Sequence, residues 1–489
     1  MMNARRNSVE SRMSESMRLG IALYSVILLS LVATYWTPPT RVSYAGEATG
    51  AYPGKSWQRT VTPEQLGWSS EKLATARAYS EQIGSAAVMI VDDGVVVDAW
   101  GNITRKFECH SMRKSLLSAL IGIHVEEGRI VLSKTMEELG IDDNEPSLTA
   151  SEKQATVGDL IKARSGIYHP ALGESPGMKA RRPERHSHAP GTFWYYNNWD
   201  FNALGTIFEQ ETGTTIFEEF HRRLAKPLQM EDFKVDDCRY LTGNDYDTGE
   251  LSIHPYYLFR MSGRDLARFG LLFLREGRWR NQQIVSSDWV RESTASQSEI
   301  GPESGYGYMW WTGVRGGLFP HVKVKEHSFC ASGAGGHRVI VLPYRKLVIV
   351  HRVDTDRRNP SVNSGQIGRL LWLILAAAGE TEIGEDTSIE AARGVRLTAD
   401  NLKETLAGSF IREGASAVSI SRDGTVSVSI EGKLVDTGKW WTQGDRFCTQ
   451  WKKIRGGKKA CRFLVLDGTI LKWFYLDGIL DGKGFFSRQ

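Results

Sequence analysis

Two serines in the chain stand three residues before a lysine, Ser111 before Lys114 and Ser69 before Lys72. Residues three apart on a helix share a face, so such a spacing places the amine beside the hydroxyl. A serine hydroxyl is a poor nucleophile until a neighbouring base takes its proton. A buried lysine can be that base, because desolvation lowers its pKa. The Ser-x-x-Lys pairs are therefore candidates for nucleophilic acyl transfer.

The surroundings of the two serines differ. Ser69 is followed by Glu71, an acidic residue that suits the first turn of a helix, so a helix cap explains this match. Ser111 leads directly into the apolar run 116–123, as expected at the start of a buried central helix. A cap remains the alternative for Ser111. His110 is not predicted to be its base, because adjacent residues of a helix point in different directions.

A second candidate segment follows the turn Pro190-Gly191 and contains Tyr195, Tyr196, Asn197 and Asn198. A Tyr-x-Asn pair on a loop between rigid elements can present a phenol and an amide to a substrate. Two registers fit, Tyr195 with Asn197 and Tyr196 with Asn198. The alternative is an aromatic cluster in the core.

A third candidate segment is Ala331-Ser332-Gly333-Ala334-Gly335-Gly336-His337, which precedes the apolar run 339–342. Small residues in a strand let a ligand or another backbone approach closely. A substrate carbonyl lying along this strand would meet backbone N–H donors. A tight bend is the alternative.

The pattern around these segments predicts the elements that hold them. Asp92-Asp93-Gly94 lies between two β-branched runs and predicts a hairpin over 87–99. Helices are predicted at 69–82, 111–127, 201–212, 263–276 and 370–378, and further strands at 339–342 and 347–350. This order indicates an α+β sandwich with a helical insert.

The composition changes after about residue 380. A polar linker follows, and alternating runs at 418–420 and 426–430 flank Asp423-Gly424. More short strands follow to the end of the chain, which predicts a small barrel or sandwich. The predicted parts are an N-terminal segment 1–45, a main domain 46–380, a linker 381–396 and a β domain 397–489.

The N-terminal segment has the physical form of a secretion signal. Arginines up to Arg18 precede an uncharged stretch, Leu19–Trp36, and Ser43-Tyr44-Ala45 offers small residues for cleavage. A retained anchor is the alternative, because the stretch is nearly long enough to span a bilayer. Either interpretation predicts a periplasmic protein, or a membrane-anchored one that faces the periplasm or the outside of the cell.

The composition bounds other functions. The 61 basic and 57 acidic residues are spread along the chain, so the sequence has no concentration of positive charge that would indicate nucleic-acid binding. Five cysteines do not make a disulfide scaffold at this length, although Cys448 and Cys461 could pair in an oxidising compartment. No further ligand residue stands at a spacing from His186 and His188 that is typical of a metal site. Neither a metal nor a cofactor is therefore predicted.

In this order, the three candidate segments resemble the serine β-lactamase and penicillin-binding protein superfamily. The resemblance covers roughly residues 60–380 and is strongest to class C-like esterases and 6-aminohexanoate-dimer hydrolases. Phrases at 160–166, 261–270 and 306–311 support it. It implies an α+β, β-lactamase-like antiparallel sheet flanked by helices with a helical insert, followed by the small all-β C-terminal domain.

The resemblance also implies roles for residues. Catalysis falls to Ser111, Lys114 and Tyr196, and the family register selects Tyr196 with Asn198. Asn198 positions the lysine and the substrate. The oxyanion hole is implied at the backbone of Ser111 and Ala334, beside Ser332 and Gly333, and Tyr168 is implied to line the pocket. Ala331 stands where β-lactamases carry a lysine that holds the penicillin carboxylate, which argues against efficient β-lactam hydrolysis.

The predicted function is that of an exported serine hydrolase that cleaves small amides or esters through an acyl-enzyme on Ser111. Membrane association would come from residues 19–36. The alternative is an envelope protein that binds ligand, or is acylated by it, without efficient turnover.

Overall fold

The computed structural model describes residues 50–60, 62–245, 252–357, 361–476, 478 and 480–488. The predicted signal or anchor, Leu19–Trp36, lies outside these residues. Within the described ranges, no helix is both long and apolar enough to cross a membrane.

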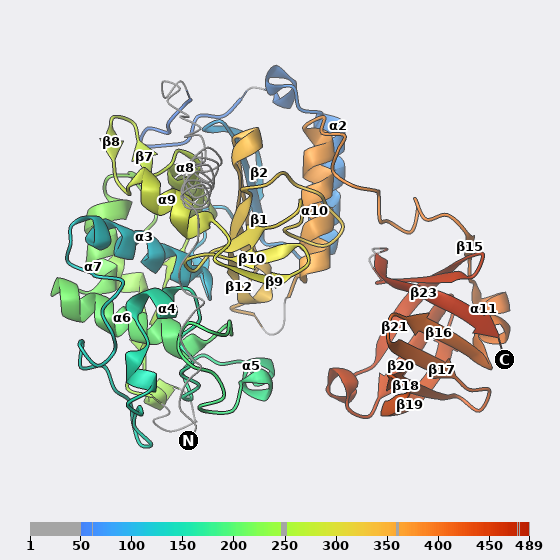
Figure 1. Cartoon of the computed structure of the whole chain (residues 1–489). Coiled ribbons are helices and arrows are strands. Elements are labelled where there is room, and N and C mark those ends of the chain that lie inside the picture. Colours follow the sequence, from blue (N-terminus) through green and yellow to red (C-terminus); the bar gives the residue numbers. More distant parts are fainter. Residues whose placement is uncertain are drawn as a thin grey trace, which may run out of the picture. The chain divides into compact units, whose positions relative to one another are not determined.

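The main domain is built on an eight-stranded antiparallel sheet in the order β2-β1-β14-β13-β12-β11-β10-β9 (Figure 1). The first and last strands of this sheet along the chain, β1 and β14, are neighbours and pair over their whole lengths. The strands are β1 Ala87–Asp92, β2 Val95–Gly101, β9 Ser298–Gly301, β10 Ser304–Tyr306, β11 Trp311–Gly313, β12 Phe329–Gly333, β13 His337–Leu342 and β14 Leu347–Arg352.

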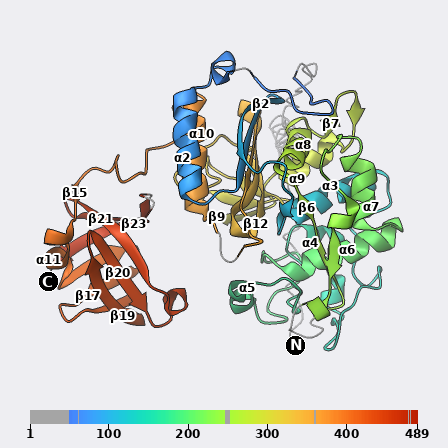
Figure 2. The same ribbon diagram turned by 180° about the vertical axis from the view of Figure 1, so that it is seen from behind.

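Helices α2 (Ser70–Gln82) and α10 (Ser364–Ala377) lie side by side on one face of this sheet (Figures 1 and 2). The strands send alternate side chains to the two faces. Val88 and Ile90 belong to the core beneath these helices, whereas Met89 and Val91 belong to the core on the opposite face.

The opposite face carries α8 (Gly263–Leu274) and α3 (Met112–Glu126). A Cβ at Gly270 of α8 would lie 2.6 Å from Cγ1 of Val348, so glycine lets this helix approach β14 closely. The helical insert contributes α4 Val157–Ile161, α5 Pro176–Arg181, α6 Asn198–Thr212 and α7 Ile216–Phe220, and α9 Ser287–Thr294 follows it. Short strand pairs join β3 Phe107–Glu108 to β6 Arg260–Met261, β4 Arg239–Leu241 to β5 Tyr256–Leu258 and β7 Arg278–Trp279 to β8 Gln282–Gln283.

The C-terminal part is a nine-stranded antiparallel sheet in the order β15-β21-β20-β19-β18-β17-β16-β23-β22, and β21 also pairs with β22. That extra pairing closes the sheet into a barrel around Ile420, Val426, Leu464 and Leu471. The strands are β15 Val395–Arg396, β16 Ser409–Glu413, β17 Ser416–Ile420, β18 Thr425–Ile430, β19 Lys433–Gln443, β20 Arg446–Trp451, β21 Ala460–Asp467, β22 Ile470–Phe474 and β23 Leu480–Arg488, with helix α11 Ala399–Leu406.

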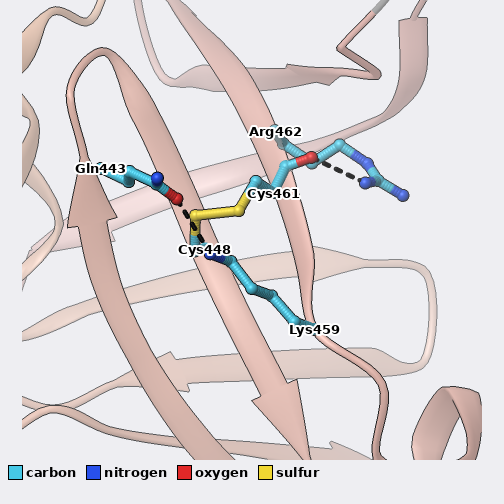
Figure 3. Close-up of a disulfide and its surroundings, with 5 residues drawn as sticks. All are labelled: Gln443, Cys448, Lys459, Cys461 and Arg462. Atoms are coloured by element: carbon cyan, nitrogen blue, oxygen red, sulfur yellow. Dashed lines mark hydrogen bonds between the residues drawn. A yellow bond between two sulfur atoms is a disulfide. The ribbon is translucent and has the colours of Figure 1, made fainter.

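Cys448 and Cys461 form a disulfide between directly opposed positions of β20 and β21 (Figure 3). The sequence suggested this pair without deciding it. The remaining cysteines, Cys109, Cys238 and Cys330, are free thiols.

The predicted α+β class, with its helical insert and all-β C-terminal domain, is confirmed. The hairpin, the helix after Ser111 and the strand pair β13–β14 stand where they were predicted. The closing helix was predicted too short, because α10 begins at Ser364 rather than at 370. Asn363 and Gln366 form a capping box there, which starts the helix before its apolar stripe begins.

Candidate active site

Ser111 is the residue immediately before α3, and its side chain does not cap that helix. Ser69, by contrast, accepts a hydrogen bond from the backbone N–H of Lys72 at 3.3 Å and caps α2. The structure thus separates the two Ser-x-x-Lys matches. Of these two serines, Ser111 is the one whose hydroxyl is not used as a helix cap.

Lys114 connects the predicted catalytic groups. Its Nζ lies 2.9 Å from Oγ of Ser111, 2.6 Å from the hydroxyl of Tyr196 and 2.9 Å from Oδ1 of Asn198. The lysine is 1% exposed. One amine therefore touches the candidate nucleophile, the phenol and the amide together.

Burial sets the protonation of this cluster. Desolvation lowers the pKa of Lys114 well below its usual value, and the charge of the neighbouring Arg113 lowers it further. Desolvation also raises the pKa of Tyr196 to about 12, against the opposing effect of its hydrogen bond with Ser111. Both directions favour a neutral amine beside a neutral phenol. A neutral amine can donate to Asn198 and still offer a lone pair to the hydroxyl of Ser111.

The loop before α6 sets which tyrosine and asparagine reach the lysine. Asn197 caps α6 by accepting from the backbone N–H of Trp199, and its Nδ2 donates to the carbonyl of Ile167 at 2.6 Å. Tyr195 donates its hydroxyl hydrogen to the carbonyl of Met178. Tyr195 and Asn197 are therefore occupied with the scaffold. The alternate positions, Tyr196 and Asn198, carry the contacts to Lys114.

Aromatic rings fix the phenol of Tyr196. Its ring packs against Phe201 of α6 at 5.1 Å between centroids, against Trp311 of β11 at 5.4 Å and against Tyr306 of β10 at 6.0 Å. Two of these rings come from the phrase at 306–311, which the sequence marked only as a family resemblance. The cluster excludes water from one side of the phenol, consistent with its raised pKa.

The end of β12 comes close to the segment before Ser111. A Cβ at Gly333 would lie 2.6 Å from the carbonyl oxygen of Cys109, so only glycine permits this approach. Within the described residues, neither the backbone N–H of Ser111 nor that of Ala334 donates a hydrogen bond. These two donors are those implied for the oxyanion hole. Ser332 lies opposite Arg338 in the β12–β13 ladder.

A hydroxyl bridges the two segments that carry those donors. Oγ1 of Thr355 lies 2.8 Å from Nε2 of His110, which precedes Ser111, and 3.1 Å from Nε2 of His337, which follows the turn at Ala334. No local pattern in the sequence predicts this bridge, because its members are far apart along the chain.

Tyr168 is buried and points its hydroxyl at Nδ1 of His188, 3.1 Å away. Burial raises the pKa of Tyr168 to about 12. Within the described residues it makes no hydrogen bond with Ser111, Lys114 or Tyr196, so its role in the pocket stays a prediction. His188 also stacks on Phe193. No group of three or more histidine, cysteine or acidic side chains suited to a metal occurs in the part of the chain that the structure describes.

Arg113 was not singled out by the sequence. It is fully buried in α3, donates to Oδ1 of Asn202 at 2.6 Å and lies 3.9 Å from the ring centroids of both Tyr256 and Tyr257. Among the described residues its Nε and Nη1 have no hydrogen-bond partner, and it forms no ion pair there. Its charge lowers the pKa of the adjacent Lys114.

A buried lysine amine hydrogen-bonded to a serine at a helix N-terminus, between an antiparallel sheet and a helical insert, has the geometry of a serine-hydrolase site. The family model for beta-lactamase matches residues 71–370. The chain therefore belongs to the β-lactamase family, and the membership predicted from the three segments is confirmed.

Several solved structures are similar to this chain. A proposed 6-aminohexanoate-dimer hydrolase from Bacillus anthracis is 21% identical with a TM-score of 0.49, over 67% of this chain and 87% of that one. An octameric penicillin-binding protein homologue from Pyrococcus abyssi is 17% identical with a TM-score of 0.49, over 85% of this chain and 99% of that one. A penicillin-binding protein from Bacillus halodurans is 14% identical with a TM-score of 0.45, over 62% and 98%.

Proposed function

We propose that the chain is an exported serine hydrolase that cleaves small amides or esters through an acyl-enzyme on Ser111. The observation that carries this proposal is the buried Lys114, whose Nζ lies within hydrogen-bond distance of Ser111, Tyr196 and Asn198 at once. Membership of the β-lactamase family agrees with it.

The contacts support a definite sequence of proton transfers. The neutral amine of Lys114 takes the hydroxyl proton of Ser111 as Oγ attacks the substrate carbonyl. The free N–H groups of Ser111 and Ala334 stabilise the oxyanion. Tyr196, bonded to the same amine, passes the proton to the departing alkoxide or amine. Water then attacks the acyl-enzyme with Lys114 and Tyr196 again as the base, which releases the acid and restores Ser111.

The third candidate segment, which begins at Ala331, limits the class of substrate. Ala331 is buried and places a methyl group where β-lactamases carry a cation. Arg338 is near, but its Nη1 is used by the carbonyls of Gly333 and His337. The guanidinium of Arg338 is thus partly engaged by backbone carbonyls, and Ala331 supplies no cation for a penicillin carboxylate. Uncharged esters and amides fit better.

Export is proposed on two observations. The N-terminal 45 residues have the charge and hydropathy pattern of a signal or anchor. In the barrel, Cys448 and Cys461 form a disulfide, which persists in oxidising compartments and is rare in the cytosol.

Intact-mass spectrometry during turnover tests the proposal. The chain and a Ser111→Ala variant are each incubated with p-nitrophenyl esters, the 6-aminohexanoate dimer and penicillin, with product release followed in parallel. We expect a transient acyl adduct and product with an ester or amide, both absent in the variant. A stable adduct without product would instead support the acylated, non-hydrolysing protein. Turnover that survives Ser111→Ala would refute the assigned nucleophile.

A further inference from the structure

One end of the C-terminal barrel exposes apolar side chains on a hairpin. Strands β18 and β19 meet at Glu431-Gly432, and beside this turn Ile430, Leu434 and Val435 are 46%, 67% and 43% exposed. Isolated exposed apolar residues need no explanation, but three on one hairpin tip are a candidate interaction surface.

A basic loop lies against this hairpin. The backbone N–H groups of Lys453 and Ile454 both donate to Oδ2 of Asp436, and that of Lys452 donates to the carbonyl of Thr437. Asp436 is only two residues beyond Leu434 in β19. The loop between β20 and β21 is thus tied to the same end of the barrel as the apolar tip.

The charge at this end is predominantly positive. Its exposed lysines are Lys433 in the hairpin and Lys452, Lys453 and Lys458 in the loop, whereas Lys459 donates to Oε1 of Gln443 further along β19. The exposed acidic residues beside them are Glu431 and, at the neighbouring β16–β17 turn, Glu413. Lysines therefore lie beside apolar side chains that are exposed in the described part of the barrel.

We propose that this end of the barrel binds the surface of an anionic phospholipid bilayer. The apolar tip would enter the boundary between headgroups and acyl chains, and the lysines would contact lipid phosphates. A soluble polyanion would satisfy the lysines but leave Ile430, Leu434 and Val435 in water, so the combination favours a bilayer. This surface is separate from residues 19–36 and does not depend on the activity of Ser111.

Sedimentation with lipid vesicles tests the proposal. Residues 50–489 are used, because they form one compact unit apart from residues 1–49 and lack the N-terminal apolar stretch. Vesicles contain phosphatidylcholine with or without phosphatidylglycerol. We expect binding that requires phosphatidylglycerol and weakens with salt. Each lysine near the surface contributes about five-fold in affinity, so Lys452→Gln with Lys453→Gln is expected to weaken binding about 25-fold.

A matched control removes two charges from the opposite end of the barrel. Arg422 and Arg446 are exposed at the β17–β18 and β19–β20 turns, and Arg422→Gln with Arg446→Gln is expected to leave vesicle binding unchanged. Circular dichroism checks that both double variants are folded. Equal losses in the two variants would overturn the assigned surface.

The apolar tip separates a bilayer from a soluble polyanion. Leu434→Ser with Val435→Ser is expected to weaken vesicle binding at least ten-fold while leaving binding to inorganic polyphosphate unchanged. A variant that binds vesicles as well as the parent would show that only charge is recognised and would overturn the bilayer assignment. Absence of binding by the parent chain to any vesicle would do the same. Ser111→Ala, which tests the proposed hydrolase, is expected to bind vesicles like the parent.

Discussion

Replacement of Asn198 by aspartate tests whether Lys114 is the base. Oδ1 of Asn198 lies 2.9 Å from Nζ of Lys114, and the change Asn198→Asp puts a carboxylate there with almost no change in shape. At 2.9 Å and an effective dielectric constant of about 20, attraction between the two charges is about 6 kcal/mol. That energy raises the pKa of Lys114 by about four.

The expected result is a displaced pH profile. A neutral lysine is active, so activity is lost as the pH falls through its folded-state pKa, which in the parent chain lies well below the usual value. In Asn198→Asp the acid limb of kcat/KM for a p-nitrophenyl ester is expected to move upward by up to about four pH units. At a pH between the two acid limbs the variant's lysine is protonated, and each pH unit of separation should reduce kcat/KM about 10-fold.

Asn198→Leu is the matched control, because it removes the same hydrogen bond without adding a charge. It is expected to lower kcat while leaving the acid limb at or below its position in the parent chain. The two profiles are measured side by side between pH 4 and 10. If both variants lose activity with no difference in their acid limbs, Lys114 is not the titrating base and the electrostatic reasoning is refuted.

Three further changes test other parts of the structure. Ser111→Ala should abolish labelling by a fluorophosphonate probe, whereas Ser69→Ala should be labelled normally and lose only about 1 kcal/mol of stability in urea unfolding, since Ser69 is a helix cap. Thr355→Val breaks the bridge between the two oxyanion segments and should lower kcat about 10- to 100-fold with little change in KM, while Thr355→Ser should retain activity; equal activities would contradict this role. Opening the disulfide with Cys448→Ser and Cys461→Ser, whose sequence separation is 13, should cost the barrel about 3 kcal/mol in denaturant unfolding and leave ester hydrolysis intact.

Local patterns predicted the elements that depend on local chemistry. The Asp93-Gly94 turn and its β-branched flanks determine the first hairpin, and the apolar run after Ser111 determines α3. The same patterns fail at the start of α10, where Asn363 begins the helix through hydrogen bonds rather than apolar periodicity. Periodicity reports burial, so it misses the polar end of an element.

The site was predictable only where its members carry a recognisable spacing. Ser111 and Lys114 are three residues apart, and their contact follows from helix geometry. The two Tyr-x-Asn registers have equal spacing, and the choice between them is made by tertiary contacts of Asn197. Thr355 could not have been found, because its partners His110 and His337 lie 245 and 18 residues away.

Arg113 shows how the fold itself adjusts the chemistry. A buried guanidinium is costly unless it is paired, and among the described residues Arg113 has one amide oxygen and the faces of two tyrosine rings around it. A neutral side chain at this position would remove that cost but also the repulsion that helps to keep Lys114 deprotonated. A neutral residue at this position could pack equally well in α3 but would not oppose protonation of Lys114. The charge of Arg113 in the first turn of α3 thus lowers the pKa of Lys114 at the expense of burying a guanidinium.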